Sequence, residues 1–348
     1  MNNKLKENDK QYPTISIIIP TFNRAEFIAD TVLSFINQEY PKDKYEIIVI
    51  DNNSSDDTKT IIQTQFKNTE PKVKYLFEKR IGNHYARNSA AKTSQSEILY
   101  FADDDILADK LLLSEIIIPF IFDKNVATAT GRILPKWSEE PPAWVKKYLH
   151  NKYLSILDPP ESFFISRNIN FLYSCHQAVR RDVFFTVGGF NPESFGTKYL
   201  GDGETGLNIK IKKLGYLFGY NGKSVSYHIM PKTRFTQKYL NRRLGNSGFS
   251  QAYTDFRKRN YAGTQIFLMI IKTTFIYLPF VYIVNIINLI KYRDINISRF
   301  FVAHGYYYKN NLKYCFWLLF DKTWRKYTLK SDWTKNENDF YDAINKRI

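Results

Sequence analysis

Short apolar segments alternate with amphipathic segments over the first hundred residues, and this alternation restricts the fold more than any other feature. The apolar segments each predict a buried β-strand, and they cover residues 15–20, 45–51, 73–78 and 97–102. The intervening segments carry apolar residues at helical spacing or begin with helix-capping residues, and they cover residues 25–38, 54–66 and 84–95. Strands that alternate with helices predict a parallel sheet with right-handed crossovers, which is an α/β fold.

The predicted strands end in polar residues, and the fourth runs directly into three aspartates, Asp103, Asp104 and Asp105. Two carboxylates at about 4 Å repel each other by about 1 kcal/mol in water and by more near a protein surface. In an extended segment Asp103 and Asp105 face one side and Asp104 the other. Two carboxylates on one face predict a site for Mg²⁺ or Mn²⁺ together with diphosphate oxygens, and a solvated acidic turn is the simpler alternative.

No glycine-rich phosphate loop of the Walker or dinucleotide type follows the first strand. Phosphate would therefore be bound by a metal ion and by basic side chains. The formal net charge of +16 indicates an anionic partner, which can be a nucleotide, a nucleic acid or an anionic membrane surface. The 348 residues are 44% hydrophobic, which excludes a disordered chain and allows one large domain or two moderate ones.

The two cysteines, Cys175 and Cys315, form neither a disulfide framework nor a zinc-binding spacing, so we expect a reducing compartment and a packing role for Cys175. The N-terminal tail, residues 1–12, is polar and does not resemble a secretory signal.

The composition changes in the C-terminal region, residues 236–348, which is aromatic and basic and predicted to be helical. Residues 273–290 contain no charged residue and are flanked by Lys272, Lys291 and Arg293. A proline and two asparagines interrupt this stretch, so it can span a membrane, lie on it, or form a buried helix. We expect membrane association at the cytoplasmic face, through an anionic leaflet.

Five segments occur in an order and spacing that resemble family 2 glycosyltransferases. They are ISIIIPTFNR, EIIVIDNNSSDDT, HYARNSAAKTSQSEILYFADDD, VGGF and GDGETGLNIKIKKLGY, and they lie between residues 13 and 230. The resemblance implies an inverting, nucleotide-sugar-dependent enzyme with a GT-A domain over residues 13–235. That fold is a mostly parallel sheet flanked by helices.

The resemblance also implies site residues. Those that match nucleotide-sugar-binding positions are Pro20, Thr21, Asn23, Arg24, Asp51, Arg87, Asp103 and Asp104. Asp105 matches the direct metal ligand, with Asp103 beside it, and His228 lies where some GT-A enzymes complete the metal shell, although a packed histidine is an equal alternative. The implied cofactor is Mn²⁺ or Mg²⁺. The family often has a second acidic residue after Asp51, where this chain has Asn52.

Glu204 lies where the family keeps its catalytic carboxylate, which takes the proton from the acceptor hydroxyl. The simpler alternative is a glutamate in the first turn of a helix, stabilised by the helix dipole. The surrounding glycines, Gly203 and Gly206, depart from the family pattern, so Asp202 is the second candidate for the base.

Acceptor contacts are predicted for Trp137 and Trp144, whose flat faces suit stacking on sugar rings, and for His176, which replaces an asparagine usual in the family. A rigid surface turn explains the two tryptophans equally well. Arg242 and Arg243 could close over the donor diphosphate, or could form a solvated basic face.

The resulting prediction is transfer of a sugar from a nucleotide diphosphate, UDP first among them, to a glycan or lipid-linked acceptor in cell-surface polysaccharide synthesis. Nucleic acid is not an expected partner. Two alternatives remain: an aspartate-dependent phosphatase, for which the expected threonine after the aspartates is missing, and a basic scaffold that binds membrane or nucleic acid without catalysis.

Overall fold

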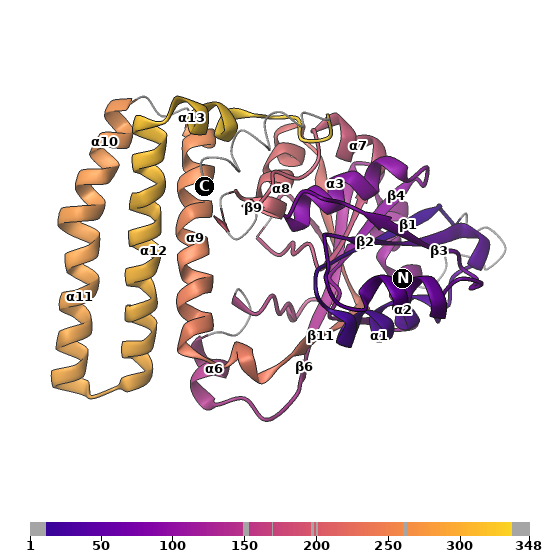
Figure 1. The fold of residues 1–348 in the computed structure, drawn as a ribbon, viewed down its shortest axis with the longest axis horizontal. Helices are drawn as coiled ribbons and strands as arrows, with labels where there is room; N and C mark the ends of the chain where they lie inside the picture. The colour runs from indigo at the N-terminus through magenta and orange to yellow at the C-terminus, as the bar shows by residue number, and fades with distance from the viewer. Residues whose placement is uncertain are drawn as a thin grey trace.

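The computed structural model describes residues 12–148, 153–168, 170–195, 198–199, 201–259 and 263–335. Nearly all of the predicted N-terminal tail and the last part of the C-terminal region lie outside these ranges. The described chain combines an α/β part, built around one large sheet, with a group of long helices packed beside it (Figure 1). The predicted α/β class with a helical C-terminal region is thus confirmed. The domain limits, 13–235 and 236–348, stay a prediction.

The first half of the sheet is parallel, as predicted, with strand order β3–β2–β1–β4. Its strands are β1 (Ile15–Thr21), β2 (Tyr45–Asp51), β3 (Val73–Phe77) and β4 (Ile98–Ala102), and its connecting helices are α1 (Ala25–Ile36), α2 (Thr58–Gln65) and α3 (Asn83–Thr93). The chain runs outward from β1 to β3 and then returns to place β4 on the other side of β1. Ligands of such sheets bind beyond the carboxyl ends of the strands at this point of reversal, between β1 and β4.

The second half of the sheet is mixed, in the order β4–β8–β6–β11–β5, with β7 also paired to β11. β8 is antiparallel to β4 and β6, whereas β6 and β11 are parallel. The bounds are β5 (Ile106–Ala108), β6 (Val126–Trp137), β7 (Phe163–Ser166), β8 (His176–Arg180) and β11 (Leu217–Met230). The parallel arrangement therefore covers the alternating N-terminal segments and does not extend across the whole sheet.

Shorter elements complete the α/β part. They are η2 (Lys42–Lys44), α4 (Leu112–Ile116), α5 (Ile118–Phe122), α6 (Ala143–Tyr148), α7 (Arg181–Thr186), the small pair β9 (Ser194–Phe195) and β10 (Lys198–Tyr199), α8 (Gly203–Lys213) and η4 (Lys232–Arg234).

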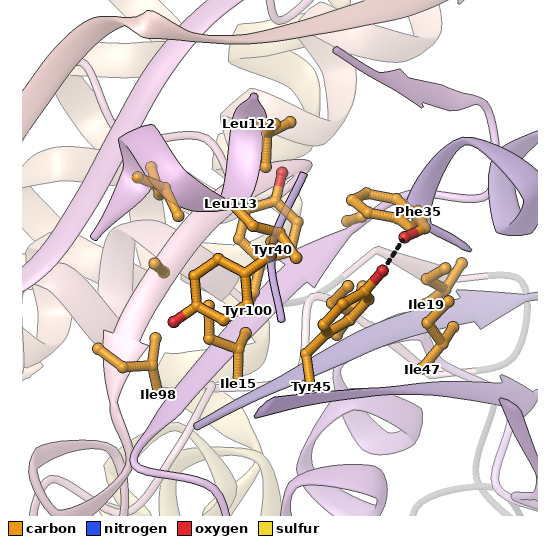
Figure 2. Packing of buried hydrophobic residues seen from close by; sticks show 14 of the residues in the cluster. Ile15, Ile19, Phe35, Tyr40, Tyr45, Ile47, Ile98, Tyr100, Leu112 and Leu113 are labelled. Atoms are coloured by element: carbon orange, nitrogen blue, oxygen red, sulfur yellow. Dashed lines mark hydrogen bonds between the residues drawn. The ribbon is translucent and has the colours of Figure 1, made fainter. Parts of the chain in front are cut away.

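Apolar side chains fill both faces of the sheet because successive residues of a strand point to opposite sides. Ile17 belongs to the core on one face and Ile18 to the core on the other. Figure 2 shows the first of these cores, where the Tyr45 hydroxyl donates a 3.0 Å hydrogen bond to the main-chain carbonyl of Phe35. A sheet covered on both faces leaves its polar strand ends as the place for a ligand.

The C-terminal helices are α9 (Gln237–Arg259), α10 (Gly263–Lys272), η5 (Thr273–Tyr277), α11 (Leu278–Ile287), η6 (Asn288–Tyr292), α12 (Ile295–Phe320) and α13 (Lys322–Leu329). The segments α10 to η6 form one long helix, interrupted by the two π-helical turns η5 and η6. α12 lies between this helix and α9, so the long helix is the element farthest from the sheet (Figure 1).

This outer helix is apolar and largely exposed. Residues Gly263–Tyr292 form a helix that is long and apolar enough to cross a membrane, and its most apolar 18-residue window has a mean hydropathy of 2.0 and is only 22% buried. Phe275 is 73% exposed, Phe280 63% and Ile290 73%. The alternative that residues 273–290 form a buried helix is therefore wrong.

Candidate active site

The three aspartates occupy the turn between β4 and β5, at the carboxyl edge of the sheet. β5 pairs with β11 in a register that sets Ile106 opposite His228, and the amide of Ile229 donates to the carbonyl of Asp105 at 2.9 Å. A strand more than a hundred residues later in the chain therefore fixes the end of the acidic segment. The same pairing places a histidine directly beside it.

Asp105 is buried and has two basic neighbours. One of its carboxylate oxygens lies 3.2 Å from Nε2 of His228, and the other accepts a 2.6 Å hydrogen bond from Nη2 of Arg234. Burial alone would raise the pKa of Asp105, but these neighbours hold it well below its usual range. Burial and the negative charge on Asp105 raise the pKa of the adjacent Asp104 to about 7.

The ligand atoms of Asp103, Asp105 and His228 all lie within 4.8 Å of one another. Two carboxylates and an imidazole suit a divalent ion such as Mn²⁺. Nδ1 of His228 is buried and has no hydrogen-bond partner among the described residues, so the ring is not fixed by a second bond. The three predicted ligands thus come together as a candidate metal cluster, and this donor set fits the expected cofactor.

A cavity of about 350 Å³ opens beside this cluster, between the ends of β1 and β4. Of the predicted nucleotide-binding residues, it is lined by Pro20, Thr21, Arg24, Asp103 and Asp104. Residues that the sequence analysis did not assign to the site complete the lining: Phe22, Asn52, Ile81, Gly82, Asn83, Ser194 and Arg234, together with the metal candidate Asp105. The polar strand ends therefore converge on one pocket, as predicted.

Two predicted nucleotide contacts shape the pocket without lining it. Asn23, with a positive φ of 52°, accepts a 2.8 Å hydrogen bond from the amide of Ser55. The buried carboxylate of Asp51 accepts bonds from the amide of Ser54 and the hydroxyl of Tyr75, both at 2.8 Å. These residues hold the loops after β1 and β2 together.

The neighbour of Asp51 lies in the pocket instead. Asn52 accepts from the amide of Gly82 at 2.7 Å and donates to the carbonyls of Glu78 and Arg80. The sequence could have indicated a role for Asn52, because it occupies a position where family 2 glycosyltransferases often have an acidic residue.

Arg87 is fully buried behind the aspartates and does not line the pocket. Its guanidinium donates to Asp103 at 2.5 Å and to the Ser174 hydroxyl at 2.8 Å. Ser174 in turn donates to Glu204 at 3.3 Å. A partly buried hydrogen-bonded chain thus connects the metal cluster with the predicted base, and Ser174 is a member that sequence reasoning missed.

Glu204 lies in the first turn of α8, half-buried, with one carboxylate oxygen 3.9 Å from Nε2 of His84. Burial, with a contribution from Arg87, lowers the pKa of His84 well below its ordinary value, so this ring is neutral at pH 7. His84 therefore adds no positive charge beside Glu204, which suits a group that must accept a proton.

Asp202, the second candidate for the base, is buried, and neither it nor Glu204 lines the cavity beside the aspartates. It accepts hydrogen bonds from Asn191 at 2.7 Å and from Thr254 of α9 at 3.0 Å. These bonds give it a structural role in joining α8 to α9. Glu204, which is only partly buried, stays the predicted base.

The structure does not support the predicted acceptor contact of His176. The residue is fully buried in β8, hydrogen-bonded to the Tyr100 hydroxyl at 2.6 Å, and burial lowers its pKa to about 4. The reason is that β8 is inserted antiparallel between β4 and β6, so the side chain of His176 lies in the core of the sheet. Its neighbour Cys175 is buried and unpaired, as expected.

Trp137 and Trp144 also do not line the cavity beside the aspartates. Both pack against the apolar cluster beneath α9, where Trp137 meets the ring of Phe235 and Trp144 lies under the guanidinium of Arg299. The indole rings contribute to the junction between the sheet and the C-terminal helices.

The mixed sheet and the acidic cluster at the end of β4 define a GT-A glycosyltransferase fold. The structure of the mannosyltransferase PcManGT from Pyrobaculum calidifontis, in complex with GDP-Man and Mn²⁺, superposes with a TM-score of 0.53 at 16% identity, over 97% of this chain and 87% of that one. At this identity the likeness shows the fold alone.

The family described as Glycosyl transferase family 2 matches residues 16–188, and the chain belongs to that family. It is 23% identical over 253 residues to the probable glycosyltransferase YdaM of Bacillus subtilis, covering 66% of this chain and 54% of the relative. It is 38% identical over 102 residues to the GalNAc(5)-diNAcBac-PP-undecaprenol beta-1,3-glucosyltransferase of Campylobacter jejuni, covering 29% and 31%. The matches thus span about half of the first relative and a third of the second.

Proposed function

We propose that this glycosyltransferase moves a sugar from a nucleotide-diphosphate donor, UDP-sugar first among them, to a glycan or lipid-linked acceptor with inversion at the anomeric carbon. The observation that carries the proposal is the cluster of Asp103, Asp105 and His228, which opens on the 350 Å³ pocket. Acidic strand ends would repel a phosphate-bearing ligand unless a cation lay between them.

The residues at the end of β1 would hold the donor against this cluster. Arg24 and Arg234 line the pocket and supply positive charge for the diphosphate, while Asn52 offers a polar edge for the nucleoside. A Mn²⁺ or Mg²⁺ ion bound by Asp103, Asp105 and His228 would neutralise charge on the departing diphosphate.

Glu204 is the proposed general base. It takes the proton of the acceptor hydroxyl while the acceptor oxygen bonds to the anomeric carbon, and the bond from that carbon to the diphosphate breaks with its electron pair. Attack from the face opposite the leaving group inverts the centre. The bonds through Ser174 and Arg87 link this carboxylate with Asp103, which supports a fixed position of the base relative to the metal cluster.

The exposed apolar helix supports contact with a membrane, and we place the protein at its cytoplasmic face. The described residues from Gly263 to Tyr292 expose large apolar side chains on the side away from the sheet, which is unusual for a surface in water. A membrane-bound position would bring the site to a lipid-linked acceptor, and synthesis of cell-surface polysaccharide is the process we propose.

The test is a thermal-shift screen of the full chain with UDP- and GDP-sugars, with and without Mn²⁺, followed by hydrolysis assays without acceptor. We expect one donor to stabilise the protein only with Mn²⁺ and to be slowly hydrolysed, and we expect the Asp103→Asn variant to lose both effects. If no nucleotide sugar stabilises the protein under either condition, the proposal fails. Salt-sensitive RNA binding without turnover would instead support the alternative of a basic scaffold protein without catalytic activity.

A further inference from the structure

A second cavity, of about 520 Å³, adjoins the donor pocket on the side of the C-terminal helices. It shares Arg24, Asp103 and Arg234 with the donor pocket and is also lined by His228 of the metal cluster. Its far wall comes from the first turns of α9, through Lys238, Tyr239, Arg242, Arg243 and Asn246. A molecule in this cavity would lie next to the reaction centre without occupying the donor site.

The wall of this second cavity is strongly positive. Its lining contains five cationic side chains, from Arg24, Arg234, Lys238, Arg242 and Arg243, and one carboxylate, that of Asp103. Asp103 is bonded to the buried Arg87, and Arg234 is bonded to the buried Asp105, so both charges are compensated within the protein. The other four cationic side chains give the cavity its positive charge.

Two of these cations lie one turn apart on the same face of α9. Arg242 follows Lys238 by four positions, and both side chains are exposed. In the part of the chain that the structure describes, neither forms an ion pair with a carboxylate, and the Arg242 guanidinium lies 5.4 Å from the centre of the Tyr239 ring. Like charges at this spacing repel each other, and an anion between them would relieve the repulsion.

Phosphate oxygens match this wall better than a neutral sugar does. Guanidinium groups bind phosphate through paired hydrogen bonds, and lysine binds it as a point charge. An acceptor sugar without charge would need hydroxyl and amide partners instead, and would gain nothing from a row of cations.

We infer that the second cavity binds a phosphate or diphosphate group carried by the acceptor, which it places beside the metal cluster. This inference rests on the proposed glycosyl transfer and specifies its acceptor class. The group could belong to a lipid-linked diphosphate or to a water-soluble phosphate-containing glycan. Because α9 also packs against α12, next to the exposed apolar helix, the cavity lies between the reaction centre and the surface proposed to meet a membrane.

The test measures binding by calorimetry to the full chain, first of UDP with Mn²⁺ and then, with UDP and Mn²⁺ saturating, of inorganic pyrophosphate and of farnesyl diphosphate. The variant is Lys238→Gln with Arg242→Gln, and Lys258→Gln provides a control for an exposed cation on the same helix outside the cavity. We expect the double variant to bind both diphosphates at least tenfold more weakly while its affinity for UDP stays within twofold. The control should match the native chain.

Stronger binding of farnesyl diphosphate than of pyrophosphate would assign the group to a lipid-linked acceptor, and equal binding to a water-soluble one. The inference is overturned if the native chain binds neither diphosphate, if the double variant binds them unchanged, or if the double variant loses UDP affinity instead, because the cations then serve the donor. If the native chain binds no UDP with Mn²⁺, it is the proposed function that fails.

Discussion

The guanidinium of Arg234 contacts two of the three proposed metal ligands, at 2.6 Å from Asp105 and 2.8 Å from Nε2 of His228. Its charge therefore compensates the same carboxylate that a divalent cation would use. Metal binding would have to displace this arginine from Asp105, after which it is close enough to contact the donor.

Replacing Arg234 by glutamine should strengthen Mn²⁺ binding in the absence of nucleotide, because a competing cation is removed from Asp105. We expect a gain of about tenfold in affinity, which corresponds to about 1.4 kcal/mol. Calorimetric titration with manganese chloride measures it, with Lys232→Gln on the same turn as the control. An unchanged or weaker affinity would show that Arg234 does not compete with the metal.

Replacing Asp105 by asparagine should destabilise the fold, because Arg234 and His228 would face a neutral amide at a buried position. Loss of one partner of a buried pair costs about 3 kcal/mol or more. Urea denaturation measures the change, and Asp158→Asn, which breaks the exposed pair with Arg132, should cost at most about 1 kcal/mol. If the two variants lose the same free energy of unfolding, burial does not make the Asp105 contacts more important than the exposed pair.

Replacing Glu204 by glutamine should lower the rate of sugar transfer by roughly 10²–10⁴, which is the usual contribution of a general base, and should leave donor binding unchanged. Asp202→Asn should mainly reduce stability, because that residue accepts bonds from Asn191 and Thr254. Transfer assays and thermal melts of both variants separate the roles. Near-normal transfer by the glutamine variant together with an inactive Asp202→Asn would reverse the assignment.

The stability of the protein should depend on pH through the buried His176. Its pKa falls from 6.5 to about 4 in the fold, so the unfolded chain binds more protons between these values, and the free energy of unfolding decreases as the pH falls. From pH 7 to pH 5 this residue should account for a loss of about 2 kcal/mol.

Denaturation of the native chain and of His176→Asn at both pH values isolates this contribution, because His84 is present in both proteins. The variant should lose less stability than the native chain between pH 7 and pH 5. If the two proteins lose the same amount, His176 does not titrate as its burial requires.

Charges placed on the outer helix should weaken membrane binding. In the Phe275→Glu, Ile290→Glu variant, two largely exposed apolar side chains are lost, so the fold should persist while binding to phosphatidylglycerol-containing vesicles falls by roughly tenfold or more. Vesicle flotation measures it. Phe122→Glu with Leu214→Glu alters two exposed apolar residues of the α/β part and should bind as the native chain does. Identical flotation of all three proteins would argue against an anchoring role of the helix.

The local part of this architecture was predictable from the sequence. Runs such as ISIIIP and YEIIVID are mainly apolar because each strand is covered on both faces, and the three aspartates mark the point where β4 leaves the core. Asp103, Asp105 and His228 come together as predicted.

The parts that depend on distant pairing were not predictable. Arg234 reaches Asp105 only because β11 pairs with β5 and then turns through η4, and no local pattern around residue 234 shows this. His176 was expected to contact the acceptor because it replaces an asparagine usual in the family, yet its strand is inserted between two others. Trp137 and Trp144 looked like sugar-stacking surfaces because their apolar partners lie far along the chain.

The pairing of β5 with β11 also divides the catalytic apparatus along the chain. The family match ends at residue 188, whereas Glu204, His228 and Arg234 all follow it. The part of the polypeptide that matches the family therefore supplies the aspartates but neither the imidazole of the candidate metal cluster nor the proposed base. A nascent chain that ended there would carry the acidic edge alone, and the candidate metal cluster forms only when β11, the last strand of the large sheet, pairs with β5.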